Sequence, residues 1–325
     1  MRSILLTLAF AISAPGAALA QQSAVPETQA REILKQARAA IWDETKSKPL
    51  QSLSITASRR FARGERQVEV EMTLDALLPD KFLQTDVLYT GVGFGVTAMR
   101  GVNGSQAWFA GESNDGAVDV AKKREAGAPP ESNSKQPGGG MGAMLGELGG
   151  VAGVRRPERS MEQSIHAGFA RLMLVWLGAT PSSLPVEFTY AGQAVAQADG
   201  KKADVLNVVG PNNFAARLFI HPETHQVLML SYKARSRNRG AQEASVNASE
   251  AEVRWVVSDY RNVNGLNLPH QLVIFLDGQP IEEVTIKKVK INPSLKPNKF
   301  ERQASIEEPV KDIKKKGNVG ARESE

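Results

Sequence analysis

The stretch from Val253 to Phe300 constrains the fold most, because it predicts consecutive antiparallel strands. Apolar and polar residues alternate in 253–260 and again in 271–276, which is the two-residue period of a strand with one buried face. Asn264-Gly265 and Asp277-Gly278 follow these segments. Both pairs are typical of tight hairpin turns, because these residues tolerate positive φ angles.

A third strand follows, and its apolar period shifts by one residue. Val284 and Ile286 are separated from Val289 and Ile291 by Lys287-Lys288. An extra residue of this kind predicts a β-bulge. The C-terminal third is therefore expected to be a meander with one continuous apolar face.

The N-terminal 20 residues predict a signal peptide. Met1-Arg2-Ser3 is basic, Ile4 to Ile12 is apolar, and Ala18-Leu19-Ala20 resembles a cleavage site. The apolar run is shorter than the roughly 20 residues that span a bilayer. The chain contains no cysteine, so we expect neither disulfides nor a cysteine-linked lipid anchor. We therefore expect export to the periplasm as a soluble protein.

The basic residues do not predict nucleic-acid binding. The formal net charge is +5, and many lysines lie in the tail, where no aromatic residues are interleaved with them. Proteins that bind single-stranded nucleic acid combine a basic groove with aromatic stacking platforms. We expect solvated loops and a disordered charged tail at 306–325 instead.

Two amphipathic or apolar segments predict helices. The first runs from Thr28 to about Glu44, with apolar residues at three- and four-residue spacing. The second runs from Ser160 to Leu177, where Ser160 and Gln163 form a capping box and Gly178 ends the helix. It is apolar nearly all round, so it is expected to be buried on most sides or to lie over an apolar groove.

The remaining sequence predicts further hairpin-linked strands and one long insertion. Alternation or apolar runs indicate strands at 53–57, 68–74, 82–89, 96–101, 106–110, 186–190, 203–209, 214–220 and 227–232. Residues 111–159 are rich in Gly and Pro and predict a flexible insertion. The expected domain is therefore a single one, 21–305, interrupted by this insertion.

This inventory predicts an α+β fold that is mainly antiparallel β. Strands lie about 4.8 Å apart, so a sheet of about eleven would be roughly 50 Å wide. Two helices, each about 10–12 Å across, cannot cover one face of it. Because large twisted sheets curl, we expect a curled half-open β-barrel of about eleven strands with a helical lid. Its interior is either an apolar cavity or a filled core.

Several turns and strand ends also resemble a known family. They are Pro79-Asp80-Lys81-Phe82, Asn103-Gly104 with Trp108, Asp259 to Gly265 with Leu268-Pro269, Lys290-Ile291-Asn292, and Phe300. With the signal peptide and first helix, they resemble the LolA/LolB-like periplasmic proteins, the outer-membrane lipoprotein-sorting family. The resemblance covers most of Glu32 to Phe300, and the Gly-rich insertion departs from it.

The resemblance implies a half-open β-barrel that carries lipoprotein acyl chains across the periplasm. The missing cysteine matches the soluble carrier type, not the anchored acceptor. The implied partners are lipid acyl chains or lipoproteins and sorting components of the inner or outer membrane, and we expect a monomer. The alternative is a non-enzymatic envelope binding or sensing module of the same fold that acts through protein partners.

An acyl carrier needs an apolar lining that can open, not polar chemistry. An acyl chain of about sixteen carbons gains roughly 12 kcal/mol on leaving water, at about 0.8 kcal/mol per methylene. The predicted lining residues are Phe169, Leu172, Met173 and Trp176 on the lid, and Val253, Trp255, Val257, Leu272, Ile274 and Leu276 on the strands. The alternative for each is an ordinary core position, the default for buried aliphatic residues.

Catalytic and metal-binding patterns are weak. His221-Pro-Glu-Thr-His225 has ligand-type residues, but a metal site needs three or four convergent ligands and the segment predicts a turn. Gly91-x-Gly93-x-Gly95 leads into a strand, not the helix that a dinucleotide loop requires. Ser132-x-x-Lys135 lies in the insertion without a supporting motif. Three carboxylates are expected to be solvated: Asp75, Asp80 and Asp86. We expect no enzymatic activity, cofactor or metal.

Overall fold

The computed structural model describes residues 18–42, 48–63, 66–89, 95–113, 158–196, 200–235 and 250–302. Residues 1–17 of the predicted signal peptide, 114–157 of the predicted insertion and the predicted tail lie outside these ranges. The helices are α1 (Ala18–Ile41), α3 (Glu158–Leu177) and the 3-10 helix η2 (Pro297–Phe300). The strands are β1 (Ser52–Arg63), β2 (Arg66–Leu77), β3 (Lys81–Tyr89), β4 (Gly95–Asn103), β5 (Gln106–Ser113), β6 (Glu187–Val195), β7 (Lys202–Gly210), β8 (Phe214–Ile220), β9 (Val227–Arg235), β10 (Glu250–Val263), β11 (Leu266–Leu276) and β12 (Gln279–Ile291).

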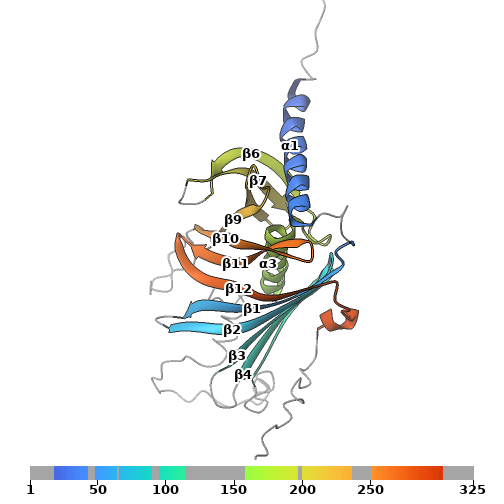
Figure 1. Ribbon diagram of the computed structural model, residues 1–325, viewed down its shortest axis with the longest axis vertical. Helices are drawn as coiled ribbons and strands as arrows, with labels where there is room; N and C mark the ends of the chain where they lie inside the picture. The colour runs from blue at the N-terminus through green and yellow to red at the C-terminus, as the bar shows by residue number, and fades with distance from the viewer. Residues whose placement is uncertain are drawn as a thin grey trace, which may run out of the picture.

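All twelve strands belong to one antiparallel sheet. Its order is β5-β4-β3-β2-β1-β12-β11-β10-β9-β8-β7-β6. Strands that are adjacent in the sheet are therefore also consecutive in the sequence, except for β1 and β12 (Figure 1). β5 and β6 are the edges and do not pair with each other, so the curled sheet stays open. The predicted fold class is confirmed: a half-open antiparallel sheet with two helices, containing one strand more than the expected eleven.

The predicted turns and bulge in the C-terminal meander are confirmed. Asn264-Gly265 has φ angles of 49° and 92°, and Asp277-Gly278 has φ angles of 47° and 81°. Positive φ at both central residues is the geometry of the hairpin turn that matches strand twist. Between β1 and β12, Thr56 pairs with Lys288 and Ala57 with Ile286. One lysine, Lys287, is therefore the extra residue of the bulge.

Helix α3 ends where the sequence predicts and begins two residues earlier than predicted. Gly178 has φ +59°, its N–H donates to Leu174 O (3.1 Å), and the N–H of Ala179 donates to Met173 O (3.4 Å). The bond from Gly178 to Leu174 is that of an αL helix end, which favours glycine because a Cβ is disfavoured at positive φ. Helix α1 also begins earlier than expected, at Ala18 instead of Thr28, and ends at Ile41.

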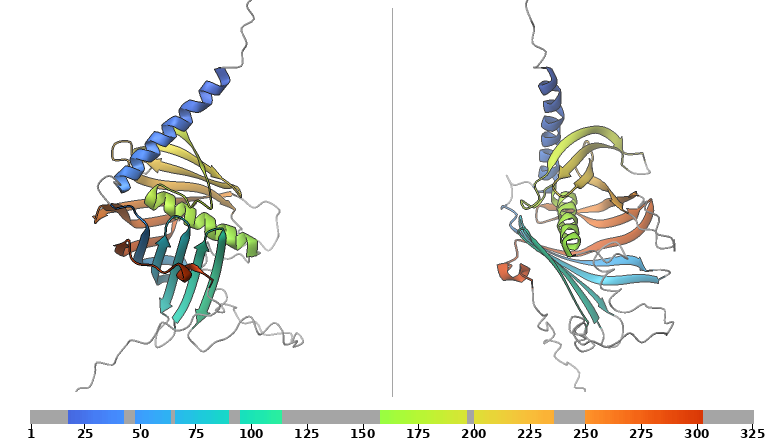
Figure 2. Two further views of the ribbon diagram at one scale, coloured as in Figure 1. Left: turned by 90° about the vertical axis from the view of Figure 1, so that its right-hand side faces the viewer. Right: turned by 180° about the vertical axis from the view of Figure 1, so that it is seen from behind.

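The two helices cover the concave side and one edge of the sheet. α3 follows the edge strand β5 in the chain and precedes the edge strand β6, and it contacts β4 and β5 on one flank and β8 and β9 on the other. Figure 2 shows it crossing between the two halves of the curled sheet. α1 packs beside β6 and projects beyond the sheet (Figure 1). Covering an edge in this way blocks pairing with another chain.

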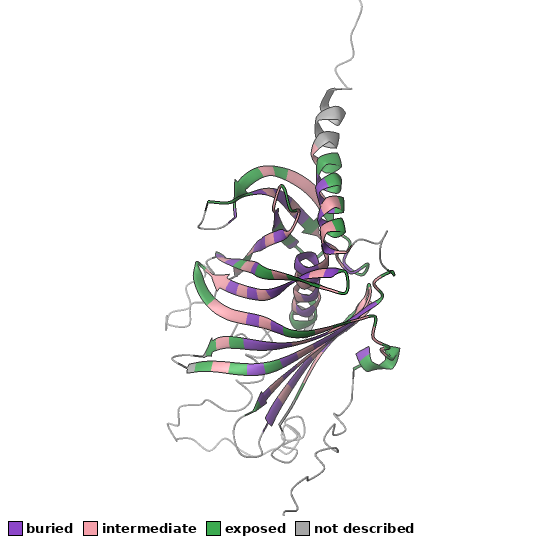
Figure 3. Ribbon diagram, in the orientation of Figure 1, coloured by how far each residue is buried: buried purple, intermediate pink, exposed green. Residues whose placement is uncertain are grey.

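The main core lies between α3 and the concave face, and buried residues recur along the strands beneath it (Figure 3). A smaller cluster lies on the outer face, where Phe300 of η2 packs beside Leu83, Met99 and Trp108. The indole N–H of Trp108 donates to Phe300 O at 3.0 Å. This contact holds the end of the described chain against β3 and β4.

Candidate functional site

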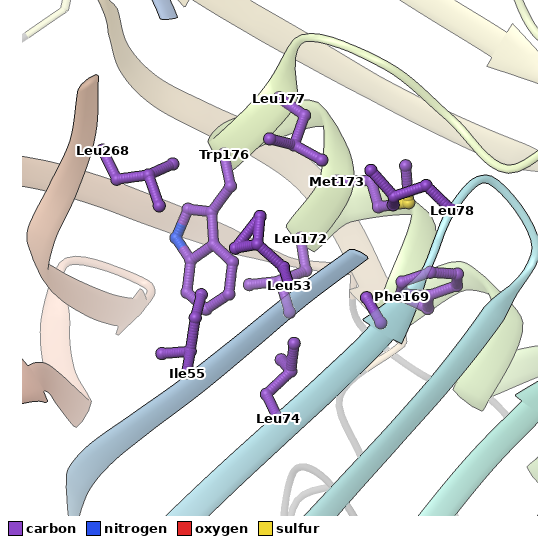
Figure 4. Close-up of a pocket in the computed structure, with 11 residues that line it drawn as sticks. Leu53, Ile55, Leu74, Leu78, Phe169, Leu172, Met173, Trp176, Leu177 and Leu268 are labelled. Atoms are coloured by element: carbon purple, nitrogen blue, oxygen red, sulfur yellow. The ribbon is translucent and has the colours of Figure 1, made fainter. Parts of the chain in front are cut away.

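The candidate site is an apolar cavity between α3 and the concave face of the sheet. Its empty volume is about 340 Å³, a figure that includes space open to solvent. No lining residue carries a charge (Figure 4). The strands contribute Leu53 and Ile55 of β1, Leu74 and Ala76 of β2, and Leu268 of β11, and Leu78 follows β2. Helix α3 contributes Phe169, Leu172, Met173, Trp176 and Leu177.

The four predicted lid residues all line this cavity. Phe169, Leu172, Met173 and Trp176 recur at three- and four-residue spacing, so they share one face of α3. The Phe169 ring packs against Phe82 of β3 with centroids 4.3 Å apart. The Trp176 indole lies between the β1 side chains and Leu268 (Figure 4). Ligand binding by these residues stays a prediction.

The six predicted strand residues lie in the same core but are not among the residues that line the cavity. They form three cross-strand pairs on the concave face: Val253 with Leu276, Trp255 with Ile274, and Val257 with Leu272. The cavity-lining face of α3 points instead toward β1 and β2. The sheet-side wall is therefore built by residues that our sequence reasoning did not single out. The alternation of apolar and polar residues in 53–57 and 68–74 indicates that these strands have a buried face. It does not indicate that this face lies opposite the apolar residues of α3.

Further along the concave face, four charged side chains form a cluster, of which Arg59 and Asp86 are buried. Arg59 donates to Asp86 (Nη1 to Oδ2, 3.0 Å) and forms a bidentate pair with Glu282 (2.6 and 2.8 Å). Arg100 donates to Asp86 at 2.7 Å. The amide of Gln84 also donates to Asp86, at 3.0 and 3.1 Å. Asp86 is 1% exposed and Arg59 5%, whereas Arg100 (15%) and Glu282 (18%) are partly exposed. The two innermost charges are therefore satisfied within the cluster and not by water.

Burial and pairing act in opposite directions on the two arginines. Burial lowers the pKa of Arg59, but Glu282 and Asp86 outweigh it, and the pKa is raised overall. For Arg100 burial is the largest influence and Asp86 does not fully offset it, so its pKa is lowered. Arg59 is therefore the firmly held cation of the cluster, with two carboxylates around it.

Two of the three carboxylates expected to be solvated are buried, so that prediction was wrong for them. Asp86 shares the concave face with Phe82 and Leu88, because residues two apart in a strand share a face. Asp75 is buried on the outer face and pairs with Lys299 at 2.5 Å. The turn residue Asp80 is hydrogen-bonded to Ser182 and Ser183 in an exposed position.

The histidine pattern forms a turn. Nδ1 of His221 accepts the backbone N–H groups of Glu223 and Thr224, both at 3.2 Å, and His225 adopts φ +56°. Within the ranges that the structure describes, no group of three His, Cys, Asp or Glu residues could hold a metal ion. His221 therefore serves the geometry of the β8–β9 connection.

Solved structures similar to this one include three with low sequence identity. A LolA superfamily protein from Nitrosomonas europaea has a TM-score of 0.45 and 10% identity, over 84% of this chain and 97% of that chain. An outer-membrane lipoprotein-sorting protein domain from Vibrio parahaemolyticus has a TM-score of 0.44 and 9% identity, over 83% and 97%. A DUF1329 family protein from Desulfovibrio piger has a TM-score of 0.44 and 9% identity, over 85% and 97%.

No protein-family model and no curated protein matches the sequence. Among the described helices, none is both long enough and apolar enough to cross a bilayer.

Proposed function

We propose that the protein is a periplasmic carrier that binds acyl chains of lipids or lipoproteins between α3 and the concave face of its sheet. The observation that supports this most is the cavity itself, which is lined by apolar side chains from β1, β2, α3 and β11. Such a surface recognises hydrocarbon and offers no group for acid–base, nucleophilic or metal chemistry. The proposed role is therefore transport or sorting, not catalysis.

The size of the cavity sets how it would work. The empty volume of about 340 Å³ includes space open to solvent, so the cavity holds at most part of a long acyl chain. A complete chain therefore requires α3 to move away from β1 and β2. Buried methylenes contribute about 0.8 kcal/mol each. An acyl chain that takes the place of the α3 side chains against the sheet therefore offsets much of the free energy that displacing the helix costs.

A cavity-filling variant tests the proposal. Ala76 is buried, lines the cavity and pairs with Leu53 across the β1–β2 register. In Ala76→Phe the ring would exclude at least two methylenes of ligand, which lowers the affinity for a palmitoylated peptide more than about tenfold. Binding is followed by the intrinsic fluorescence of the tryptophans, one of which, Trp176, lines the cavity.

Ala215→Phe is the matched control, because Ala215 lies exposed on β8; it should bind as the wild type does. Mass spectrometry of organic extracts from protein purified without detergent should also identify bound lipid. If no lipid is extracted and the spectrum does not change at saturating peptide, the carrier proposal fails. Capture of a stable protein partner without lipid would favour the envelope binding or sensing module instead.

A further inference from the structure

The end of β12 and the segment that follows it carry an excess of positive charge. From Val284 to Arg302 the sequence has six basic residues and one acidic residue, Glu301. All six basic residues are exposed, and Figure 1 shows η2 just beyond the end of β12. They are Lys287, Lys288 and Lys290 of β12, Lys296 before η2, Lys299 in η2, and Arg302.

The strand lysines lie on the outer side of the cavity wall. Lys290 pairs with Ser54 in the β1–β12 ladder, and Lys288, two residues earlier, shares its face. Ser54 stands between Leu53 and Ile55, whose side chains line the cavity. Because successive residues of a strand point to opposite faces, Lys288 and Lys290 point away from the cavity on the outer face of the same strands.

No carboxylate of the described chain pairs with the three lysines of β12. Lys299 differs from them, because its ammonium pairs with the buried Asp75 at 2.5 Å. Exposed cations elsewhere on the outer face also have partners: Lys233 of β9 pairs with Glu250 of β10 at 2.9 Å. The positive charge at the end of β12 is therefore not compensated by the fold itself.

These charges repel one another in the free protein. Two residues that share a face of a strand lie about 7 Å apart, which is within the Debye length of about 8 Å at physiological ionic strength. An extended anionic surface would relieve this repulsion. Protein interfaces are depleted in lysine, whereas clustered lysines are attracted to the phosphates of anionic lipids. The surface that fits best is therefore a bilayer.

Neighbouring strands part beside these lysines. The ladder between the two described strands β11 and β12 ends at the pair Gln271–Thr285, although both strands continue beyond it. Pro269 has no N–H to continue the ladder from β11, and the bulge at Lys287 interrupts β12. Leu268, which lines the cavity, lies in the part of β11 that does not pair with β12. This part of the cavity wall is therefore not held by a continuous ladder.

We propose that Lys287, Lys288, Lys290 and Lys296 form a basic face that docks on a bilayer containing anionic phospholipids. The lipid phosphates compensate the lysines, and docking brings the place where β11 and β12 part close to the bilayer surface. This inference goes beyond the carrier proposal, because it concerns where the protein docks and not what its cavity holds.

Co-flotation of the full-length mature protein with vesicles tests the choice of surface. The wild type should bind vesicles of phosphatidylcholine mixed with phosphatidylglycerol and should not bind vesicles of phosphatidylcholine alone. Added NaCl should weaken the binding, because salt screens exposed charges. Equal binding to both kinds of vesicle would overturn the proposal, and this comparison needs no variant to fold.

Two triple variants that remove the same charge test the assignment to β12. Replacing its three lysines by glutamine should lower the affinity for phosphatidylglycerol vesicles about a hundredfold, at about fivefold per lysine. The control carries the same number of changes at exposed positions of β7, β8 and β9 and should bind as the wild type does. Its substitutions are Lys202→Gln, Arg217→Gln and Lys233→Gln.

The remaining outcomes also decide. An equal loss in both triple variants would attribute the binding to net charge and overturn the basic face. Failure of the wild type to bind phosphatidylglycerol vesicles would overturn it as well and favour an acidic protein as the partner. The carrier proposal would survive either result, because the assay with palmitoylated peptide contains no bilayer.

Discussion

Replacing Asp86 by Asn should destabilise the protein strongly, because it leaves the buried Arg59 and the partly buried Arg100 with one carboxylate. Asp86 accepts hydrogen bonds from Arg59 (3.0 Å), Arg100 (2.7 Å) and Gln84 (3.0 and 3.1 Å). Asparagine keeps the shape but removes the negative charge and turns an NH₂ group toward guanidinium donors. Breaking a buried ion pair from one side costs about 3–5 kcal/mol, because the remaining charge is uncompensated.

Urea unfolding at neutral pH measures this loss. With a slope of about 1–3 kcal/mol per molar urea, the midpoint should fall by at least about 1 M. Asp259→Asn is the matched control, since Asp259 pairs with Arg261 at 2.5 Å but both side chains are exposed. Exposed pairs contribute little, so its midpoint should stay close to that of the wild type. If the two variants unfold at the same urea concentration, the concave-face charges do not stabilise the fold as argued.

Two further substitutions test a buried hydroxyl and a close contact. Burial raises the pKa of Tyr260, whose hydroxyl donates to Val227 O at 2.7 Å. The free energy of unfolding of Tyr260→Phe should therefore be about 1 kcal/mol lower than that of the wild type at pH 7. Above about pH 10 the tyrosine ionises in the unfolded wild type but stays neutral in the folded one, so only the wild type loses stability and the difference should shrink. A difference that does not change with pH in urea titrations would contradict this. In Gly101→Ala the new Cβ would lie 2.1 Å from Cε2 of Trp108, so we expect a loss of about 1–3 kcal/mol from forced repacking, measured by thermal unfolding. Gly168→Ala on α3 meets no atom within 4 Å and should instead stabilise by up to about 1 kcal/mol, and an equal effect of both alanines would refute the clash.

The parts of the fold that were predictable are those that short stretches of sequence determine. The turns at Asn264-Gly265 and Asp277-Gly278, the bulge at Lys287 and the helix end at Gly178 each depend on the conformational freedom of one or two residues. The pairing of β1 with β12 joins residues more than two hundred positions apart. No local pattern specifies that partner, although it creates the centre of the sheet.

The charged cluster could not be predicted from any single stretch of sequence, because its residues come from different strands that share one face of the sheet. Arg59 lies on the same face of β1 as Leu53 and Ile55, and Asp86 lies on the same face of β3 as Phe82. Opposite charges at buried-face positions of two strands indicate an internal ion pair, whereas the local sequence around Asp86 resembles a solvated strand edge. Recognising the pair therefore requires the register of β1, β2 and β3 together.

The sequence left open whether the interior is a cavity or a filled core, and the structure explains why. The cavity walls and the packed core use the same residue types, Leu, Ile, Met and aromatics, and both belong to one cluster around α3. A space of about 340 Å³ corresponds to only a few side chains in a core of this size. The residues on α3 could be placed in the interior from the sequence, because a helix that is apolar nearly all round must face the interior. Whether space remains beneath it depends on how Trp176 and Phe169 pack against β1 and β3, which only the three-dimensional arrangement determines.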